Sequence, residues 1–516
     1  MRQVFSSRAR TSSAALLALV ASSVAFRLPA FLNAEGVNSD AGIVGLQAMH
    51  IQRGELSWFL FGSGYQTSVD SVIAALFFTV AGASALVLMV SAFVGHLAAT
   101  LLAFATLRRH VTAGLAFLLT LPLVVTPGAV HTYVLHPPRQ ASLTLVFVSI
   151  WLLDAAAHAR SPRLRYAAGS AVMTLACFAD PYALLFLPPL ALLAVLAALD
   201  GSPARAVVMT RIGVCTVGAA LGVVPLVLLM RSPQSVHGEA TLTASVFAHN
   251  WRLFCDTCMP WLLSTTAFVG RPEGWGPWVA PAWFRAVQLV GAALFVAGFL
   301  FAGLALRMRT IPWEIRRLGI FGLVVLALTV VGFLGSVMVM DLFSTRYLAA
   351  IVLASPFALA PAACALRGRR FAFALAPYAV SAGVAGWLAF SPWVDGPRIV
   401  RTPSGTAHHE RQLAVMLHER GVACAMADYW VAYRLTLLFD EKIVVVPTHK
   451  REDRYPPYRA AFDSAPVVAY IFDPDRSRED MASMETQLRS AGVKIGRTEI
   501  LQAGTLTALV VHRLEI

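Results

Sequence analysis

The sequence has 516 residues, of which 58% are hydrophobic and 13% are charged, and its formal net charge is +13 at pH 7. An ordinary soluble domain carries about 25% charged residues, so this composition excludes a typical soluble protein and predicts one that is solvated by lipid. The basic balance by itself would allow a nucleic-acid partner, but the positions of the arginines argue against one.

Apolar segments recur along the first 390 residues. A helix needs about 20 mostly apolar residues to cross the hydrocarbon core of a bilayer. We predict about eleven spans, at 12–32, 78–106, 111–127, 140–157, 166–180, 183–199, 212–230, 283–306, 318–340, 347–366 and 371–390. The fifth and sixth are separated by Asp180-Pro181, which forms either a turn or a kink, and the spans alternate in orientation only if both are counted.

Arginines gather in short loops at alternate span ends, whereas the longer loops between them carry few. The clusters lie at 2–10, 108–109, 160–165, 205–211, 307–317 and 367–370. This positive-inside bias predicts a cytoplasmic N-terminus. It explains the net charge by membrane topology, so no nucleic-acid partner is expected. The N-terminus has the basic start of a secretory signal, but Arg27 and Pro29 stand where a cleavage site would lie, so we interpret it as an uncleaved first span.

Three of the predicted external loops stand out, at 33–68, 128–139 and 231–282, and an interfacial helix is expected at 69–77. The third loop carries four tryptophans: Trp251, Trp261, Trp275 and Trp278. Such residues favour the membrane–water boundary, so the loop is either an interfacial cover or a lid over a lipid-facing groove. In the same loop, Cys255 and Cys258 are expected to be a disulfide or free thiols rather than a zinc site, because the one further ligand nearby is His249.

After residue 390 the composition changes to alternating strands and helices. Helices are predicted at 408–419, 428–438 and 478–491, and strands at 421–426, 442–446 and 467–472, with two more within 493–513. The predicted fold is therefore an all-α polytopic membrane domain at 1–390, followed by a small soluble α/β domain at 391–516 outside the membrane. The sequence has no Walker lysine loop, glycine-rich dinucleotide fingerprint or HExxH motif, so nothing supports an ATP-driven pump.

Asp40 is the main candidate for chemistry. It lies in Asn38-Ser39-Asp40-Ala41-Gly42, just beyond the outer end of the first span, and 41–53 is predicted to be an amphipathic helix. Ser39 and Asp40 are both favourable N-cap residues. An ordinary helix cap is therefore the alternative to a catalytic role.

Several stretches, in this order, resemble GT-C membrane glycosyltransferases, in particular the bacterial branch related to protein O-mannosyltransferases and the lipid A aminoarabinose transferase. After Asp40 and its short helix, the stretches are FGSGYQ at 61–66, FADPYALLFLP at 178–188, STRYL at 344–348, ADYWVAYRL at 427–435 and RYPPY at 454–458. Each stretch alone is weakly specific, and their order and topology carry the resemblance.

The resemblance implies a many-span GT-C fold, a catalytic aspartate at Asp40, and a hexosyl- or pentosyl-transferase that uses a polyprenyl-phosphate-linked sugar. The acceptor would be a lipid, glycan or protein at the outer face of a bacterial inner membrane, with the C-terminal domain on the periplasmic side. No cofactor is required, but a divalent metal is left open. Many relatives carry Asp-Glu where this chain has Asp40-Ala41, and Glu35, Glu55 or Asp70 are the acids that could take the place of the glutamate.

The proposed chemistry is an inverting displacement with Asp40 as base. A guanidinium suits the departing phosphate, and the candidates are Arg346 and Arg139. Candidate substrate-binding residues are Asp180, Tyr65, Gln66 and Tyr347.

Each of these candidates has a structural alternative. Arg346 could reach the interface or pair with Asp341, and Arg139 could be an ordinary loop arginine. We expect His50 to be satisfied or solvated, and Asp428-Tyr429-Trp430 to determine the local fold.

Other functions remain to be weighed: a lipid or small-solute transporter or flippase, a polysaccharide polymerase or ligase, and a non-catalytic envelope assembly protein. Transporters tend to show repeated halves and ionisable groups near the bilayer midplane. Here the charged residues crowd the outer span ends and no repeated halves are found, which favours chemistry at the surface.

Overall fold

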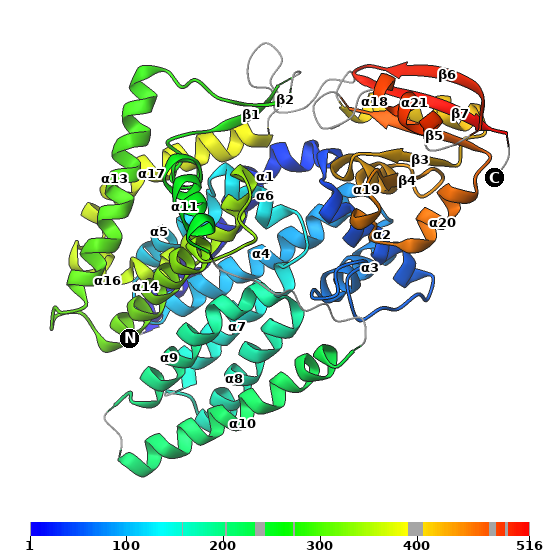
Figure 1. Cartoon of the computed structure of the whole chain (residues 1–516). Coiled ribbons are helices and arrows are strands. Elements are labelled where there is room, and N and C mark those ends of the chain that lie inside the picture. Colours follow the sequence, from blue (N-terminus) through cyan, green and yellow to red (C-terminus); the bar gives the residue numbers. More distant parts are fainter. Residues whose placement is uncertain are drawn as a thin grey trace.

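The computed structural model describes residues 2–156, 158–201, 204–232, 243–271, 274–390, 406–473, 481–490 and 494–514. A bundle of helices extends to Phe390, and a C-terminal domain containing a sheet is described from Thr406 onward (Figure 1). Within the described residues, eight segments are long and apolar enough to cross a membrane. They are α1 (Arg2–Leu32), α4 (Ala85–Arg108), η2 with α9 (Pro181–Phe186 and Leu187–Ala198), α10 (Arg205–Met230), α13 (Ala282–Ala305), α14 (Trp313–Leu334), η4 with α15 and α16 (Leu342–Leu348, Ala349–Ala358 and Ala360–Ala365) and α17 (Arg369–Phe390).

The other three predicted spans are helical but shorter or less apolar. They are α5 (Ala113–Val124), α7 (Gln140–Ala156) and α8 (Pro162–Ala179). Helix α8 packs between α7 and α10. A Cβ atom on Gly218 or Gly222 of α10 would lie 2.2 or 2.1 Å from the carbonyl oxygen of Ala167 or Ala171, so small residues let these two helices approach closely. The predicted helical membrane domain is confirmed.

Two predicted boundaries need correction or refinement. The span predicted at 78–106 starts too early, because α3 (Val69–Ala81) ends at Gly82, whose φ is +82°, and α4 begins after Ser84, which caps the Val87 amide at 3.2 Å. At Asp180-Pro181 the chain makes a turn rather than a kink. The Asp180 carboxylate accepts the Tyr182 amide at 2.7 Å and starts the 3₁₀ segment η2.

A cluster of charges centred on the buried residues Arg317 and Asp154 joins three parts of the bundle. Arg317 of α14 lies 2.9 Å from Asp154 of α7 and 2.7 Å from Asp200 beyond α9, and it has no exposed surface. His110 also contacts Asp154, at 2.9 Å. Removing one partner from such a cluster leaves an uncompensated buried charge, which costs about 3–5 kcal/mol.

We therefore expect Arg317→Ala to lower the free energy of unfolding by about 3–5 kcal/mol. The melting temperature of the detergent-solubilised protein measures the effect. Arg309→Ala, at an exposed position in the preceding loop, is the matched control and should melt like the parent. Equal melting of the two variants would show that the cluster does not stabilise the bundle.

The described residues of the third of these predicted external loops form regular elements. It forms α11 (Ala244–Leu253), the π-helical turn η3 (Phe254–Cys258), α12 (Met259–Leu262) and a hairpin of β1 (Phe268–Arg271) and β2 (Gly274–Pro277). The Asn250 amide donates to the carbonyls of Phe333 and Leu334 at the end of α14 and of Ser336 just beyond it, which ties the loop to the bundle. Cys255 is exposed, Cys258 is buried, and both are free thiols.

The C-terminal domain is a mixed five-stranded sheet with helices, as predicted. The strands are β3 (Cys424–Ala427), β4 (Val444–Pro447), β5 (Val467–Phe472), β6 (Ile495–Ala503) and β7 (Leu506–Arg513), in the order β4-β3-β5-β7-β6. Strand β3 pairs in parallel with β4 and β5, whereas β7 is antiparallel to both of its neighbours. The helices are α18 (Thr406–Glu419), α19 (Tyr429–Leu438), α20 (Pro456–Ser464) and α21 (Met481–Ser490). Helix α20 was not predicted, although proline is well suited to a first helical turn.

Candidate active site

Helix α2 (Ser39–Gln52) holds Asp40 in its first turn. The cap is Asn38, whose side chain accepts the Ala41 amide at 2.9 Å, so the alternative in which Asp40 is the cap is wrong. Nearly every residue of α2 from Ser39 to His50 is buried, so the predicted amphipathic helix is also wrong. The helix packs against α3 on one side and α19 of the C-terminal domain on another.

Gly42 permits the close contact between α2 and α19. A Cβ atom at this position would lie 2.9 Å from the Tyr433 carbonyl oxygen. The contact brings the start of α19 over the first turn of α2, where Asp40 lies.

The C-terminal domain places two side chains beside Asp40. The Tyr429 hydroxyl donates to Oδ1 of Asp40 at 2.5 Å, and Nη2 of Arg454 donates to the Tyr429 oxygen at 3.2 Å. Sequence reasoning did not select Tyr429 or Arg454 as site residues, although both lie in stretches that carry the resemblance. The ADYW and RYPPY motifs were the available signal.

Arg346 is a residue of the bundle whose charge interacts with that of Asp40. It lies in η4, within electrostatic range of both Asp40 and Arg139. Its guanidinium stacks over the Tyr347 ring at 5.1 Å and donates to the Tyr347 hydroxyl at 3.3 Å. Asp341 instead caps η4, accepting the Phe343 amide at 2.9 Å. Among the described residues, no carboxylate forms an ion pair with Arg346, so the predicted alternative of an Asp341 pair does not occur.

Asp180 organises a neighbouring network. Its Oδ2 accepts from the Gln66 amide at 2.8 Å and lies 3.4 Å from Nε of Arg139. The Arg139 guanidinium also lies over the ring of Tyr182, 5.6 Å from its centroid, and the Tyr182 hydroxyl donates to the Tyr347 carbonyl at 3.2 Å. The structure thus joins four of the predicted residues, Gln66, Arg139, Asp180 and Tyr347, but Asp180 mainly orients its neighbours. Tyr65 is half-exposed and lies within electrostatic range of Arg454.

Asp70 fixes the position of Arg139. Its carboxylate accepts the backbone amides of Arg139 at 2.8 Å and Ala141 at 3.1 Å, at the start of α7. An acidic group at a helix N-terminus is favourable because it meets unpaired amides and the positive end of the helix dipole.

The acids predicted to replace a second carboxylate are engaged elsewhere. Glu35 pairs with Arg411, Glu55 with His50, and Asp70 with the α7 amides. Among the described residues, Arg346 and Arg454 are guanidinium groups within electrostatic range of Asp40, and their positive charge opposes the binding of a divalent cation there. Elsewhere in the described residues, His158, Asp200 and Glu314 lie close enough to share an ion, but Asp200 is already bound by Arg317.

A second cluster of charged side chains joins the other end of α2 to the C-terminal domain. Buried His50 contacts Glu55 at 2.7 Å through Nδ1 and Glu441 at 2.6 Å through Nε2. Tyr458 donates to Glu441, and Arg53 pairs with the same carboxylate at 2.5 Å. His50 is therefore satisfied, as expected.

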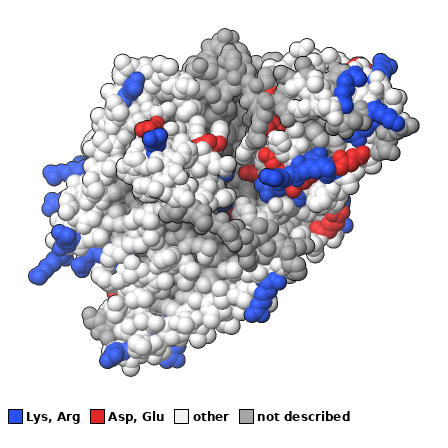
Figure 2. Space-filling model, in the orientation of Figure 1, with Lys and Arg blue, Asp and Glu red and all other residues white. Residues whose placement is uncertain are grey.

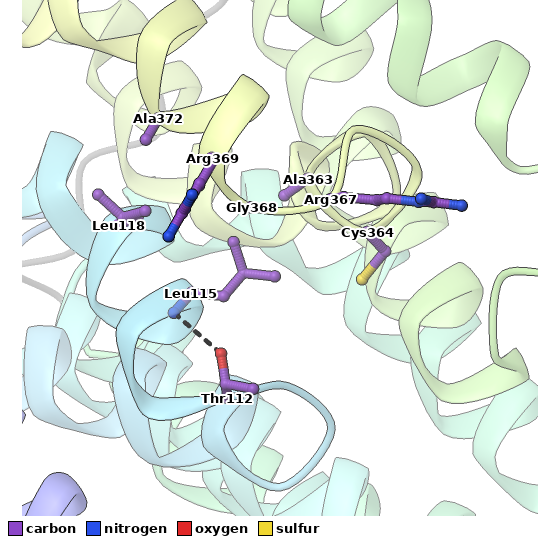
Figure 3. Close-up of a pocket in the computed structure, with 9 residues that line it drawn as sticks. All are labelled: Thr112, Leu115, Leu118, Ala363, Cys364, Arg367, Gly368, Arg369 and Ala372. Atoms are coloured by element: carbon purple, nitrogen blue, oxygen red, sulfur yellow. Dashed lines mark hydrogen bonds between the residues drawn. The ribbon is translucent and has the colours of Figure 1, made fainter.

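A cavity of about 450 Å³ lies apart from these residues. It is lined by α5, α16 and α17 with the turn before α17, and its two arginines, Arg367 and Arg369, stand among apolar walls (Figure 3). It contains no carboxylate that could act as a base. On the face seen in Figure 2, much of the bundle surface is uncharged, basic side chains lie along its left and lower edges, and acidic and basic side chains gather together beside the C-terminal domain.

Comparison with known proteins agrees with this architecture. No protein-family model and no curated protein matches the sequence. The structure of ArnT from Cupriavidus metallidurans bound to undecaprenyl phosphate matches with a TM-score of 0.55 and 11% identity, covering 96% of this chain and 97% of that one. The chain has the GT-C fold.

An oligosaccharyltransferase from Archaeoglobus fulgidus in its apo form is also similar, with a TM-score of 0.46 and 9% identity, over 90% of this chain and 69% of that one. The GT-C fold expected from the sequence motifs is thus confirmed by the ArnT match. At such low identity the likeness concerns the fold, and the roles of individual residues depend on the geometry described above.

The His50 cluster predicts a dependence of stability on pH. Burial lowers the pKa of His50, but its bonds to Glu441 and Glu55 outweigh this and raise the pKa above the ordinary value. A raised pKa in the folded state means that the contribution to stability is complete below about pH 6.5, the unfolded value, and is lost as pH rises through the folded value.

We expect His50→Gln to lower the melting temperature most at about pH 5.5–6.5, with a smaller difference from the parent at higher pH. The measurement is the melting temperature of both proteins in this pH range and at higher pH values. His449→Gln, at an exposed position of the same domain, is the control. A difference that stays constant with pH would contradict a protonated His50.

Proposed function

We propose that this protein is a membrane glycosyltransferase that moves a sugar from a polyprenyl-phosphate-linked donor to an acceptor hydroxyl at the outer face of a bacterial inner membrane. The observation that carries the proposal is the position of Asp40 at the junction of the bundle and the C-terminal domain, bonded by Tyr429 and within electrostatic range of Arg346. The same fold occurs in ArnT, whose structure holds undecaprenyl phosphate, which supports a lipid-phosphate donor.

The chemistry needs one base and one cationic partner. The acceptor hydroxyl gives its proton to the Asp40 carboxylate while its oxygen attacks the anomeric carbon. The bond from that carbon to the phosphate oxygen breaks, and the electron pair leaves with the polyprenyl phosphate, so the anomeric configuration inverts. The leaving phosphate gains negative charge, and a guanidinium at its position stabilises this charge as it develops.

Arg346 suits the phosphate role better than Arg139. The guanidinium of Arg139 faces the buried Asp180, which already compensates its charge. Arg346 has an aromatic neighbour and no carboxylate partner among the described residues. A guanidinium in that situation can bind a phosphate without first breaking an ion pair. We therefore assign the donor phosphate to Arg346 rather than to Arg139.

We expect Asp40→Asn to abolish transfer while leaving the protein folded, because an amide is isosteric but cannot accept the proton. The assay compares cell-envelope glycans and polyprenyl-linked sugars in cells that lack the protein and cells that carry each variant. Loss of transfer should leave one lipid-linked sugar accumulated, and that sugar identifies the donor.

Asp440→Asn, an exposed position in the C-terminal domain, is the matched control and should restore the glycan profile. Full transfer by Asp40→Asn would refute the proposed base. A profile that does not change when the protein is absent would favour transport or assembly instead.

We expect Arg346→Ala to weaken the binding of undecaprenyl phosphate about 10- to 100-fold, the effect of losing a hydrogen bond to a charged group. Arg346→Lys should recover part of the affinity, because lysine keeps the charge but not the planar fork. Binding of undecaprenyl phosphate to the purified protein in detergent measures this, with Arg309→Ala as control. Unchanged affinity in Arg346→Ala would remove Arg346 from the donor site.

A further inference from the structure

Tyr429 and Asp40 come from different parts of the molecule. Asp40 belongs to a helix of the first external loop, and Tyr429 begins α19 of the C-terminal domain. The 2.5 Å bond between them therefore exists only while the two parts are docked. Asp428 fixes the start of α19 by accepting the Trp430 amide at 3.0 Å, which holds Tyr429 at the first helical position.

The direction of the hydrogen bonds around Tyr429 is determined by their chemistry. Arginine has donors and no acceptor, so the Tyr429 oxygen must accept from Nη2 of Arg454. The single phenolic hydrogen is then left to point at Oδ1 of Asp40. Arg454 thus orients Tyr429, and Tyr429 donates to the carboxylate.

Arg454 is itself held in place from both parts. Its Nη1 donates to the Gly62 carbonyl at 3.0 Å, and its backbone amide donates to the Tyr433 hydroxyl at 2.6 Å. Gly62 has φ of +62°, and a Cβ atom there would lie 2.5 Å from the Arg454 Cα atom. Glycine is therefore required at this contact, which explains the first glycine of the FGSGYQ stretch.

Tyr429 remains a donor at every working pH. Burial, and then the negative charge of Asp40, raise the pKa of Tyr429 well above its ordinary value of 10. The other carboxylate oxygen, Oδ2 of Asp40, receives no hydrogen bond from the described residues, so it can accept the proton of a substrate hydroxyl.

We propose that Tyr429, oriented by Arg454, is a positioning residue of the transfer reaction: it holds Oδ1 of Asp40, directs Oδ2 toward the acceptor hydroxyl, and so makes the docked C-terminal domain part of the active site. This inference rests on the proposed function. It assigns to the C-terminal domain a direct role in the reaction, in addition to covering the bundle.

A positioning role differs from a structural one in its effect on the pH profile. A donor to a carboxylate stabilises the ionised form over the protonated form. Removing the Tyr429 hydroxyl should therefore move the acidic limb of the pH–rate profile to higher pH. The expected shift is roughly one pH unit if the hydrogen bond favours the ionised form about tenfold. A change that merely loosened the domain would lower the rate without moving the limb.

The experiment uses the full-length protein and native substrates. Membranes from cells lacking the protein supply the accumulated lipid-linked sugar and unmodified acceptor, and purified variants are added to them at a series of pH values. Tyr429→Phe should lower the maximal rate about 10- to 100-fold, shift the acidic limb upward, and leave the melting temperature and undecaprenyl phosphate binding unchanged. Arg454→Gln should act in the same direction.

Tyr470→Phe, in β5, is the matched control because Tyr470 bonds Arg513 rather than a site residue, and it should behave like the parent. If Tyr429→Phe has the rate and the acidic limb of the parent, the inference is overturned. A lower rate with an acidic limb at the same pH as in the parent would overturn it as well. If Tyr429→Phe fails to fold, Arg454→Gln is judged by the same two criteria. Transfer by Asp40→Asn would instead refute the proposed function, so the two failures are distinguishable.

Discussion

The contact between α2 and α19 is the constraint on which the site depends. Asp40 lies on a short helix outside the bundle, and a helix of this length gains its stability mainly from packing. Here the packing comes from α3 and from the C-terminal domain, and the latter contributes through Gly42 at one end and the His50–Glu441 pair at the other. These contacts leave little freedom for the orientation of the Asp40 side chain. The same contact places Tyr429 and Arg454 beside Asp40. The docking of the C-terminal domain therefore both stabilises the helix and completes the site.

The charges around Asp40 fall into two functionally different groups. Arg139 faces Asp180, which is also held by Gln66, so this pair is compensated before any substrate arrives. Arg346 and Arg454 are held mainly by tyrosines and a backbone carbonyl. Neutral partners position a guanidinium without cancelling its charge, so these two arginines keep a positive field near Asp40. Such a field favours an anionic leaving group, which is consistent with displacement of a lipid phosphate.

The buried charges at the other end of the bundle show the opposite arrangement. Arg317 is bound by two carboxylates and has no exposed surface. Its hydrogen bonds and ion pairs hold α14 against α7 and the end of α9. The partners of an arginine therefore distinguish a structural role from availability to a ligand. Burial alone does not make this distinction.

Sequence patterns were sufficient for the membrane architecture because lipid imposes a local rule: each crossing needs its own run of apolar residues. Each predicted span is therefore helical. After residue 390, the alternation of strand and helix patterns is also a local signal, and it predicted the C-terminal domain. The choice of Asp40 and Arg346 also came from sequence, from motifs with a fixed order. Two of the exceptions were the start of α4 and helix α20, where one glycine or a pair of prolines changes the local conformation without changing the overall hydropathy.

The linear pattern of residues thus defined the set of elements and a short list of polar candidates. Which of these candidates face one another depends on the packing of the folded chain: Asn38 rather than Asp40 caps α2, Asp180 neutralises Arg139, and Tyr429 reaches Asp40 from the C-terminal domain. The physical reason is that periodicity and capping act between near neighbours. A hydrogen bond between residues 389 positions apart depends on how whole domains dock.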